Sequence, residues 1–110
     1  MKFKFLTALI VMTLSKGAFA AGMSDDATIN KVGCHMNNAT CYVYLDQTVG
    51  PDSCSSNSIR WSKDAENGQE TLSLLTAAFF AGKKASFYVL DSCYEDGIYP
   101  TFGYFNVNNN

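Results

Sequence analysis

The sequence predicts a small, mainly β domain with one helix, braced by two disulfides. Three observations support this class. The chain has 110 residues, which is enough for one domain. Its apolar residues recur in short, alternating stretches rich in β-branched and aromatic side chains, as in strands. Four cysteines follow a leader-like N-terminus, a combination typical of exported proteins with disulfides.

The first 20 residues have the pattern of a secretory signal peptide. Lys2 and Lys4 precede an apolar run over residues 5–14, and the small-x-small ending Ala18-Phe19-Ala20 follows. We therefore expect cleavage after Ala20, with Ala21 as the second choice, and a secreted or periplasmic domain over residues 21–110. The alternative is an N-terminal core helix. No apolar run reaches the roughly 18 residues of a membrane span, so none is expected.

The expected mature chain is acidic, because the leader contains three of the eight basic residues and none of the ten acidic ones. Nucleic acids bind basic surfaces, so we expect no nucleic-acid partner. One histidine, His35, and cysteines without a C-x-x-C pair do not make a zinc site. We therefore expect neither a metal nor a cofactor.

The cysteines are predicted to form two disulfides once the chain is exported. Their positions allow three pairings, and spacing does not select among them. Two bridges would stabilise a small core by about 2–4 kcal/mol each. The residues concerned are Cys34, Cys41, Cys54 and Cys93.

Three strands are predicted before the helix. Residues 25–33 alternate weakly, residues 41–46 alternate strongly, and residues 58–62 alternate again. Turn residues over 49–52 separate the second strand from the third, and a polar loop over 63–68 leads into the helix.

The helix is predicted over residues 69–81, with Gly82 as its stop. It is apolar around most of its circumference, which predicts packing on the sheet together with either contact with another chain or deep burial. The apolar stripe consists of Leu72, Leu75 and Phe79, widened by Leu74, Ala78 and Ala81.

Two further strands, over 85–90 and 101–107, are separated by a turn over 95–97. The order is therefore three strands, a helix and two strands. That order fits a small OB-fold barrel of five to six short strands, with the helix between the third and fourth. A ferredoxin-like sandwich would need a second helix, and none is evident.

Several motifs occur in a recognisable order across residues 30–105. They are Val32-Gly33, Cys41 and Cys54 followed by Trp61, Leu72-x-x-Leu75, the helix end over 78–83, the strand Ser86-Phe87-Tyr88, and Tyr99-Pro100-x-Phe102. In order and spacing they resemble the B subunits of the subtilase cytotoxin, typhoid toxin and pertussis toxin-like group. The resemblance implies an OB-fold B subunit of a bacterial toxin.

The resemblance also implies a disulfide pairing and an assembly. Cys41 would pair with Cys54, and Cys34 with Cys93. Subunits of this group form pentameric rings with helices around a central pore, bind host glycans, and deliver an enzymatic A subunit. The polar row of the helix would then face the pore, through Gln69, Ser73, Thr76 and Lys83.

The sequence departs from the family at its sugar site. A family serine and a family tyrosine align with Met23 and Val89, and their neighbours Ser24 and Tyr88 would need a one-residue slip that reverses the face of a strand side chain. The family site therefore does not carry over directly. Candidate glycan-binding residues, chosen as polar or aromatic groups on strands, are Ser24, Asp25, Tyr42, Tyr44, Asp46, Gln47 and Tyr88.

Two functions follow as hypotheses. The first is a secreted, non-catalytic, ring-forming carbohydrate-binding subunit. The second is a small secreted structural or interaction protein on the same scaffold without glycan binding, which the substitutions at Met23 and Val89 favour. An enzyme is not expected, because the carboxylates Asp91, Glu95 and Asp96 surround Cys93 in a predicted turn, whereas a glycosidase needs two carboxylates across a cleft.

Overall fold

The computed structural model describes residues 20–109, which form a mainly β domain with six strands and one α-helix. The predicted leader lies outside the described residues except for Ala20. The strands are β1 (Gly22–Met23), β2 (Ala27–Cys34), β3 (Thr40–Val49), β4 (Ser56–Ser62), β5 (Lys84–Cys93) and β6 (Pro100–Asn108). Helix α1 spans Gly68–Ala81, and short 3₁₀ helices lie at Asp52–Cys54 (η1) and Tyr94–Asp96 (η2).

The element order confirms the prediction, since the five long strands and the helix occur where the sequence pattern places them. The helix was predicted over 69–81 and begins one residue earlier, at Gly68. Strands β3 and β5 are longer than expected, at ten residues each. The two-residue strand β1 was not predicted, because two residues are too few to show alternation.

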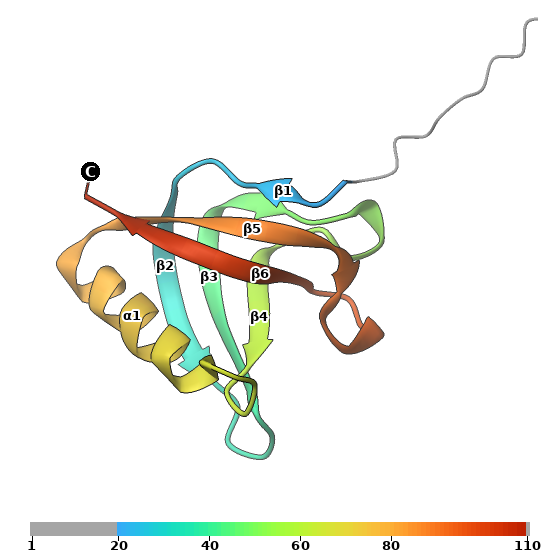
Figure 1. The fold of residues 1–110 in the computed structure, drawn as a ribbon, viewed down its shortest axis with the longest axis horizontal. Helices are drawn as coiled ribbons and strands as arrows, with labels where there is room; N and C mark the ends of the chain where they lie inside the picture. Colours follow the sequence, from blue (N-terminus) through green and yellow to red (C-terminus); the bar gives the residue numbers. More distant parts are fainter. Residues whose placement is uncertain (1–19, 110) are drawn as a thin grey trace, which may run out of the picture.

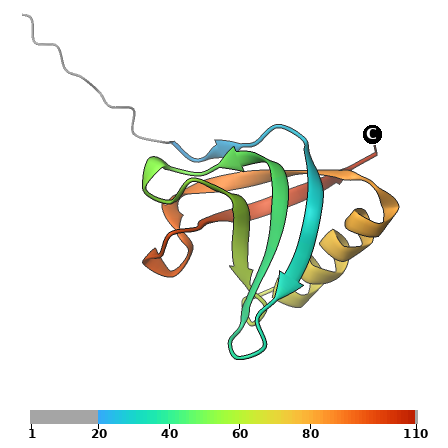
Figure 2. The same cartoon turned by 180° about the vertical axis from the view of Figure 1, so that it is seen from behind.

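The strand pairs of the described residues are all antiparallel. Strand β5 has three partners, β1, β2 and β6, and so joins the β2–β4 ladder to the rest of the sheet. On one edge β5 pairs with β1 and then with the start of β2, and on the other edge it pairs with β6. Strand β2 continues into a ladder with β3, which pairs with β4. Figures 1 and 2 show β5 and β6 crossing one face of the β2–β4 ladder.

Strand β2 bends as it changes partner. Its first residues pair with β5, and its later residues pair with β3, with a register shift between Ile29 and Lys31. Such an irregularity increases local twist and lets one strand belong to two differently oriented parts of a sheet. The bend is why β5 and β6 lie across β2–β4 instead of extending the same plane.

The junction between β4 and β6 is open in the described residues, where no backbone ladder joins these two strands. Side chains approach each other there instead. The Thr101 hydroxyl donates a hydrogen bond to the Arg60 carbonyl oxygen at 2.7 Å, and the rings of Trp61 and Phe102 lie 5.7 Å apart. The sheet is strongly curved, but the backbone pairing does not close it.

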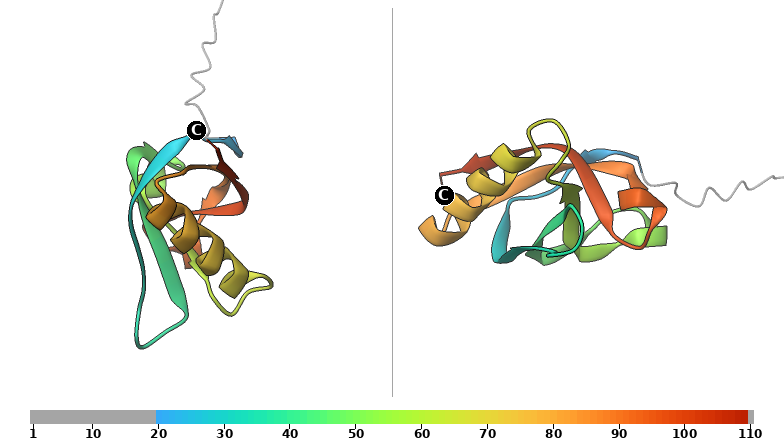
Figure 3. Two further views of the ribbon diagram at one scale, coloured as in Figure 1. Left: turned by 90° about the vertical axis from the view of Figure 1, so that its left-hand side faces the viewer. Right: turned by 90° about the horizontal axis from the view of Figure 1, so that it is seen from below.

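Helix α1 lies between the β2–β3 part of the sheet and the β5–β6 part (Figure 3). Its C-terminal stop is the predicted Gly82, which has a φ of 70°. The Gly82 and Lys83 amides donate to carbonyls of the last turn, those of Phe79 and Ala78. Glycine enters this left-handed conformation without the steric cost that a side chain would bring.

Only one face of the helix is buried. Leu75 and Ala78 are buried, and Leu72 and Phe79 pack against the core from its margin. Leu74 is 55% exposed, and Ala81 is also exposed, so two of the residues that widen the apolar stripe do not face the core, and deep burial of the whole helix is wrong for the single chain. A helix that contacts a sheet through one face buries about one residue per turn completely, and Leu74 lies beside that line rather than on it.

The core lies between the two parts of the curved sheet and the helix. Alternation along the strands fills it, because Val43 and Leu45 of β3, Ile59 of β4 and Phe87 of β5 are all nearly inaccessible. Trp61 closes the end next to the helix, where its indole N–H donates to the Gly68 carbonyl at 2.9 Å. Gly68 is required at this contact, since a β-carbon there would collide with the Ser62 carbonyl.

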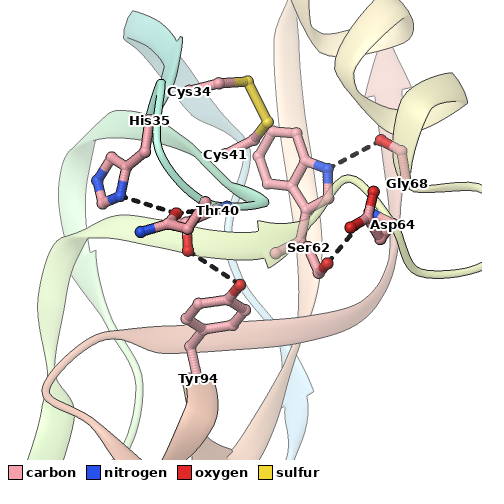
Figure 4. Close-up of a disulfide and its surroundings, with 10 residues drawn as sticks. Cys34, His35, Thr40, Cys41, Ser62, Asp64, Gly68 and Tyr94 are labelled. Carbon is pink, nitrogen blue, oxygen red and sulfur yellow. Dashed lines mark hydrogen bonds between the residues drawn. A yellow bond between two sulfur atoms is a disulfide. The ribbon is translucent and has the colours of Figure 1, made fainter.

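The disulfide pairing implied by the family resemblance is wrong. The structure joins Cys34 to Cys41 (Figure 4) and Cys54 to Cys93, not Cys41 to Cys54 and Cys34 to Cys93. Cys34 and Cys41 are direct cross-strand partners in the β2–β3 hairpin, with 3.9 Å between their Cα atoms. Cysteines held opposite each other in this way pair with each other rather than with more distant cysteines.

The second bridge connects the η1 segment before β4 to the end of β5. Cys54 and Cys93 have Cα atoms 6.0 Å apart and close a separation of 39 residues. The bridge therefore lies near the open β4–β6 junction. Both bridges agree with the expected export to an oxidising compartment, and no helix of the described residues is long and apolar enough to cross a membrane.

Candidate functional site

A pocket of about 300 Å³ opens where β1 and β5 meet the end of β3. It contains two of the predicted glycan-binding residues, Ser24 and Gln47, and both positions at which the sequence departs from the toxin family, Met23 and Val89. The remaining lining residues are Ala20, Gly22, Thr48, Val49 and Gly50. The unpredicted pairing of β1 with β5 builds this pocket, because it brings residues 22–24 beside Val89.

The polar groups of the pocket differ in what they can still bind. The Ser24 hydroxyl accepts a hydrogen bond from the Phe87 amide and donates one to the Asp25 carbonyl, both at 3.0 Å. It therefore fixes β1 against β5. The Gln47 side-chain nitrogen donates to the Asp26 carbonyl at 3.2 Å, which orients the amide and leaves its oxygen as an acceptor.

Met23 and Val89 line the pocket beside its polar groups, but they differ in exposure. Val89 points into the core and is 2% exposed, so it offers a ligand almost no surface. Met23 is exposed at the rim and is the cross-strand partner of Tyr88. A few oriented polar groups above an apolar base are typical of small-molecule sites.

A pair of stacked tyrosines continues the surface outward from Met23. Tyr88 of β5 pairs with Tyr104 of β6, and their rings are nearly parallel, 5.1 Å apart with 7° between their planes. Tyr104 is 54% exposed, whereas Tyr88 is half-buried. We call Met23, Tyr88 and Tyr104 the aromatic row. Tyr88, one of the predicted glycan-binding residues, does not line the pocket itself. It lies beside the pocket, because its cross-strand partner Met23 lines it.

The structure does not bring the other predicted glycan residues into the pocket. Asp25 is exposed and does not line it. Asp46 accepts a hydrogen bond from the Thr28 amide at 3.1 Å, which holds β3 to β2. Gln47 reaches the pocket because alternation along β3 places it on the same side as Leu45 and Val49, not on the outer face with Tyr42, Tyr44 and Asp46.

Tyr42 and Tyr44 lie on a second surface, the outer face of the β2–β4 ladder. Their rings meet edge to face, 5.7 Å apart. Between them and Tyr99 lies Arg60 of β4, with its Cζ atom 4.9 Å from the Tyr42 ring centroid and 3.6 Å from that of Tyr99. We call these four residues, Tyr42, Tyr44, Arg60 and Tyr99, the arginine–tyrosine cluster.

The predicted pore residues are divided between two environments on the helix. Gln69 and Ser73 are exposed and line a surface hollow with Leu74. Thr76 and Lys83 are half-buried, and the Lys83 ammonium donates to the Asn109 side-chain oxygen at 3.0 Å. The exposed face of the helix is therefore not the predicted polar row alone. It also carries the apolar side chains of Leu74 and Phe80, and Phe80 is 80% exposed.

Sequence reasoning missed Arg60, Tyr99 and Tyr104. For Arg60 a signal existed, because it alternates with Ile59 and Trp61 in a predicted strand and so had to share an outer face with the tyrosines of the neighbouring strand. Tyr104 likewise alternates outward in a predicted strand. Tyr99 follows an irregular loop, in which Glu95 and Asp96 have positive φ. Such a loop has no periodicity from which the direction of the Tyr99 side chain could be predicted.

The predicted carboxylate cluster is solvated. Asp91, Glu95 and Asp96 are all exposed, at the end of β5 and in η2. A comparison of the chain with protein-family models, curated proteins and solved structures finds no match.

Proposed function

We propose that this protein is a secreted, non-catalytic carbohydrate-binding subunit of the toxin B-subunit type. The observation that carries the proposal is the pocket between β1 and β5, which places Gln47 and Ser24 beside the aromatic row. Saccharides combine apolar C–H faces with hydroxyl groups, so they bind where an exposed aromatic surface adjoins oriented amide and hydroxyl groups.

In this site, Gln47 and Thr48 supply polar groups for sugar hydroxyls. The exposed ring of Tyr104 lies outside the pocket, two strands from Met23 at the far end of the aromatic row, where it could contact a longer glycan. Ser24 holds β1 in position, since its hydroxyl is engaged by the backbone on both sides. Ala20 at the pocket rim would be removed by the expected cleavage, which opens the site further.

The OB-fold barrel is the architecture that we propose for the curved sheet. Its support is the nearly complete cycle of neighbours, in which β2 pairs with β3 and β5, β3 with β4, and β5 with β6. At the remaining junction, β4 and β6 approach through the contacts of Thr101 with Arg60 and of Phe102 with Trp61. The helix lies at one end of this cycle, between the third and fourth long strands.

We also propose that the chain forms a ring, with a homopentamer as the expected state. The exposed face of α1 supports this, because Leu74 and Phe80 leave large apolar side chains in water. Burial of such side chains against identical neighbours is favourable. Gln69 and Ser73 would then line the central pore, and an enzymatic A subunit is the partner expected there.

A second function on the same scaffold is a secreted structural or interaction protein without glycan binding. Two observations favour it. Val89 is buried where the family has a contacting tyrosine, and the Ser24 hydroxyl is already bonded to the backbone. Ring formation would be retained in this case, and sugar binding would be lost.

A glycan array with oxidised residues 21–110 tests the proposal. We expect binding to a defined set of glycans that is reduced at least about tenfold by Gln47→Ala, because the lost acceptor would leave a sugar hydroxyl unpaired. Gln69→Ala, an exposed glutamine on the helix, is the matched control and should bind as the unmodified chain does. Absence of binding to any glycan at high protein concentration would select the second function.

A further inference from the structure

Arg60 is a cation buried without a carboxylate. Its side chain is 8% exposed, although it lies on the outer face of β4. Within the described residues, its guanidinium contacts only Ser58 and three tyrosines: Nε donates to the Ser58 hydroxyl at 3.1 Å, and Nη2 donates to the Tyr44 hydroxyl at 3.5 Å. A buried charge is ordinarily paired, so this arrangement requires an explanation.

Two tyrosine rings contact the guanidinium. The Arg60 Cζ atom lies over the Tyr99 and Tyr42 rings, 3.6 and 4.9 Å from their centroids, and both contacts provide cation–π stabilisation. The Tyr42 ring packs over Gly33, its partner on the neighbouring strand, because a β-carbon at Gly33 would lie 2.6 Å from the Tyr42 hydroxyl oxygen. The rings thus stabilise the charge of Arg60 without using its N–H groups as carboxylates would.

Part of that edge reaches solvent. The described contacts use Nε and Nη2 and leave Nη1 without a hydrogen-bond partner. No buried side-chain nitrogen or oxygen of the described residues lacks a partner, so Nη1 is accessible to water. A guanidinium that is held by two rings and has Nη1 free on one edge can donate to an acceptor that approaches in its plane, as a carboxylate does.

A second cation lies on the same face. Lys31 pairs with Tyr44 across the β2–β3 ladder, and its ammonium is 4.7 Å from the Tyr44 ring centroid. The acid on this face of β3, Asp46, is held by the Thr28 amide on β2. The surface over the arginine–tyrosine cluster thus has two cations, although the chain as a whole is acidic.

We propose that the arginine–tyrosine cluster, together with Lys31, is a binding site for a small carboxylate ligand. The carboxylate would accept hydrogen bonds from the free edge of Arg60 and from the Tyr44 hydroxyl, with Lys31 as a second positive charge. None of these residues lines the pocket between β1 and β5, so this site does not depend on the proposed carbohydrate function. The same carboxylate chemistry occurs in free organic acids and in sugar acids.

Titration of oxidised, ¹⁵N-labelled residues 21–110 by NMR tests the site, with the Arg60 Nε–H signal as the readout. Acetate and D-glucuronate are the probes at constant ionic strength, and D-glucose is the neutral control. We expect saturable shifts with both carboxylates and none with glucose. Tighter binding of glucuronate would identify a sugar acid, and equal affinities would identify the carboxylate group alone as the ligand.

Variants separate binding from a purely structural role of Arg60. Arg60→Lys retains the charge and the side-chain stem but not the planar fork, and it should weaken binding by about tenfold while leaving a folded protein. Lys31→Ala should weaken it about threefold, and Lys84→Ala, an exposed lysine on β5, should have no effect. If the Arg60 signal of the unmodified chain shows no saturable shift with either carboxylate up to about 100 mM, far above the roughly 1 mM dissociation constant expected for such a contact, the proposal is overturned.

Discussion

The ring of Tyr99 lies against the guanidinium of Arg60, with 3.6 Å between the Arg60 Cζ atom and the ring centroid. This contact attaches the segment between β5 and β6 to the outer face of β4. It acts together with the Cys54–Cys93 bridge and with the hydrogen bond from Thr101 to the Arg60 carbonyl. Three different interactions thus cross the one junction of the sheet that backbone pairing leaves open.

Replacement of Tyr99 by leucine should therefore destabilise the domain. The change keeps most of the apolar volume but removes the aromatic face over Arg60, and we expect a loss of about 1–2 kcal/mol in the free energy of unfolding. Urea unfolding of the oxidised protein measures it. Ile98→Ala, at the exposed neighbouring residue, is the control and should change stability by less than about 0.5 kcal/mol. Equal effects of the two variants would show that the ring contact adds nothing.

Gly33 and Tyr42 should be energetically coupled. Gly33→Ala introduces a β-carbon 2.6 Å from the Tyr42 hydroxyl oxygen, so the ring must move, and we expect a loss of about 1 kcal/mol. In the background of Tyr42→Ala the same substitution should cost nothing, because the colliding ring is gone. A double-mutant cycle in urea measures the coupling. Additive effects of the two substitutions would contradict the predicted contact.

The observed disulfide pairing makes a chemical prediction. Proteolysis of the non-reduced protein should yield one linked pair of fragments with Cys34 and Cys41 and another with Cys54 and Cys93. Mass spectrometry identifies the pairs directly. Recovery of fragments linked through Cys41 and Cys54 would restore the pairing that the family resemblance implied.

The two bridges should also differ in how much they contribute to the free energy of unfolding. Closure of a 39-residue separation restricts the unfolded chain more than closure of a 7-residue separation. The chain-entropy relation gives about 4 kcal/mol for Cys54–Cys93 and about 2.4 kcal/mol for Cys34–Cys41. Paired cysteine-to-alanine variants measured by thermal unfolding should follow that order, and the reverse order would contradict it.

The exposed helix face predicts how the proposed ring responds to charge. Phe80→Asp places a carboxylate on the most exposed apolar residue of α1, and it should shift the oligomer to monomer in native mass spectrometry without unfolding the subunit. Ile98→Asp makes the same change at an exposed apolar residue away from the helix and should leave the assembly intact. A monomeric unmodified chain would rule out the ring.

The sequence predicted the strands and the helix because their signals are local. Alternation places Val43 and Ile59 in the core, and Gly82 ends the helix where its left-handed conformation is needed. The pairing of cysteines depends instead on which strand residues face each other, and the hairpin register that sets Cys34 opposite Cys41 is not a local property. Apolar composition likewise did not show that Leu74 faces water.

The site was predicted less well for the same reason. Ser24 and Gln47 do come together, but through β1, a strand too short to recognise, and Tyr88 lies only beside their pocket, as the cross-strand partner of Met23. Tyr42 and Tyr44 were expected in the same site and lie instead with Arg60 on another surface. Residue type indicated which side chains could bind a ligand, whereas the strand pairing decided which of them act together.

The carbohydrate proposal is tested most directly by locating a bound glycan. Oxidised, ¹⁵N-labelled residues 21–110 are titrated with the strongest array ligand, and the shifted amide signals are assigned. We expect saturable shifts at Met23, Ser24, Gln47 and Thr48, with little change along α1. Shifts confined to the helix, or no saturable binding by any glycan, would contradict it.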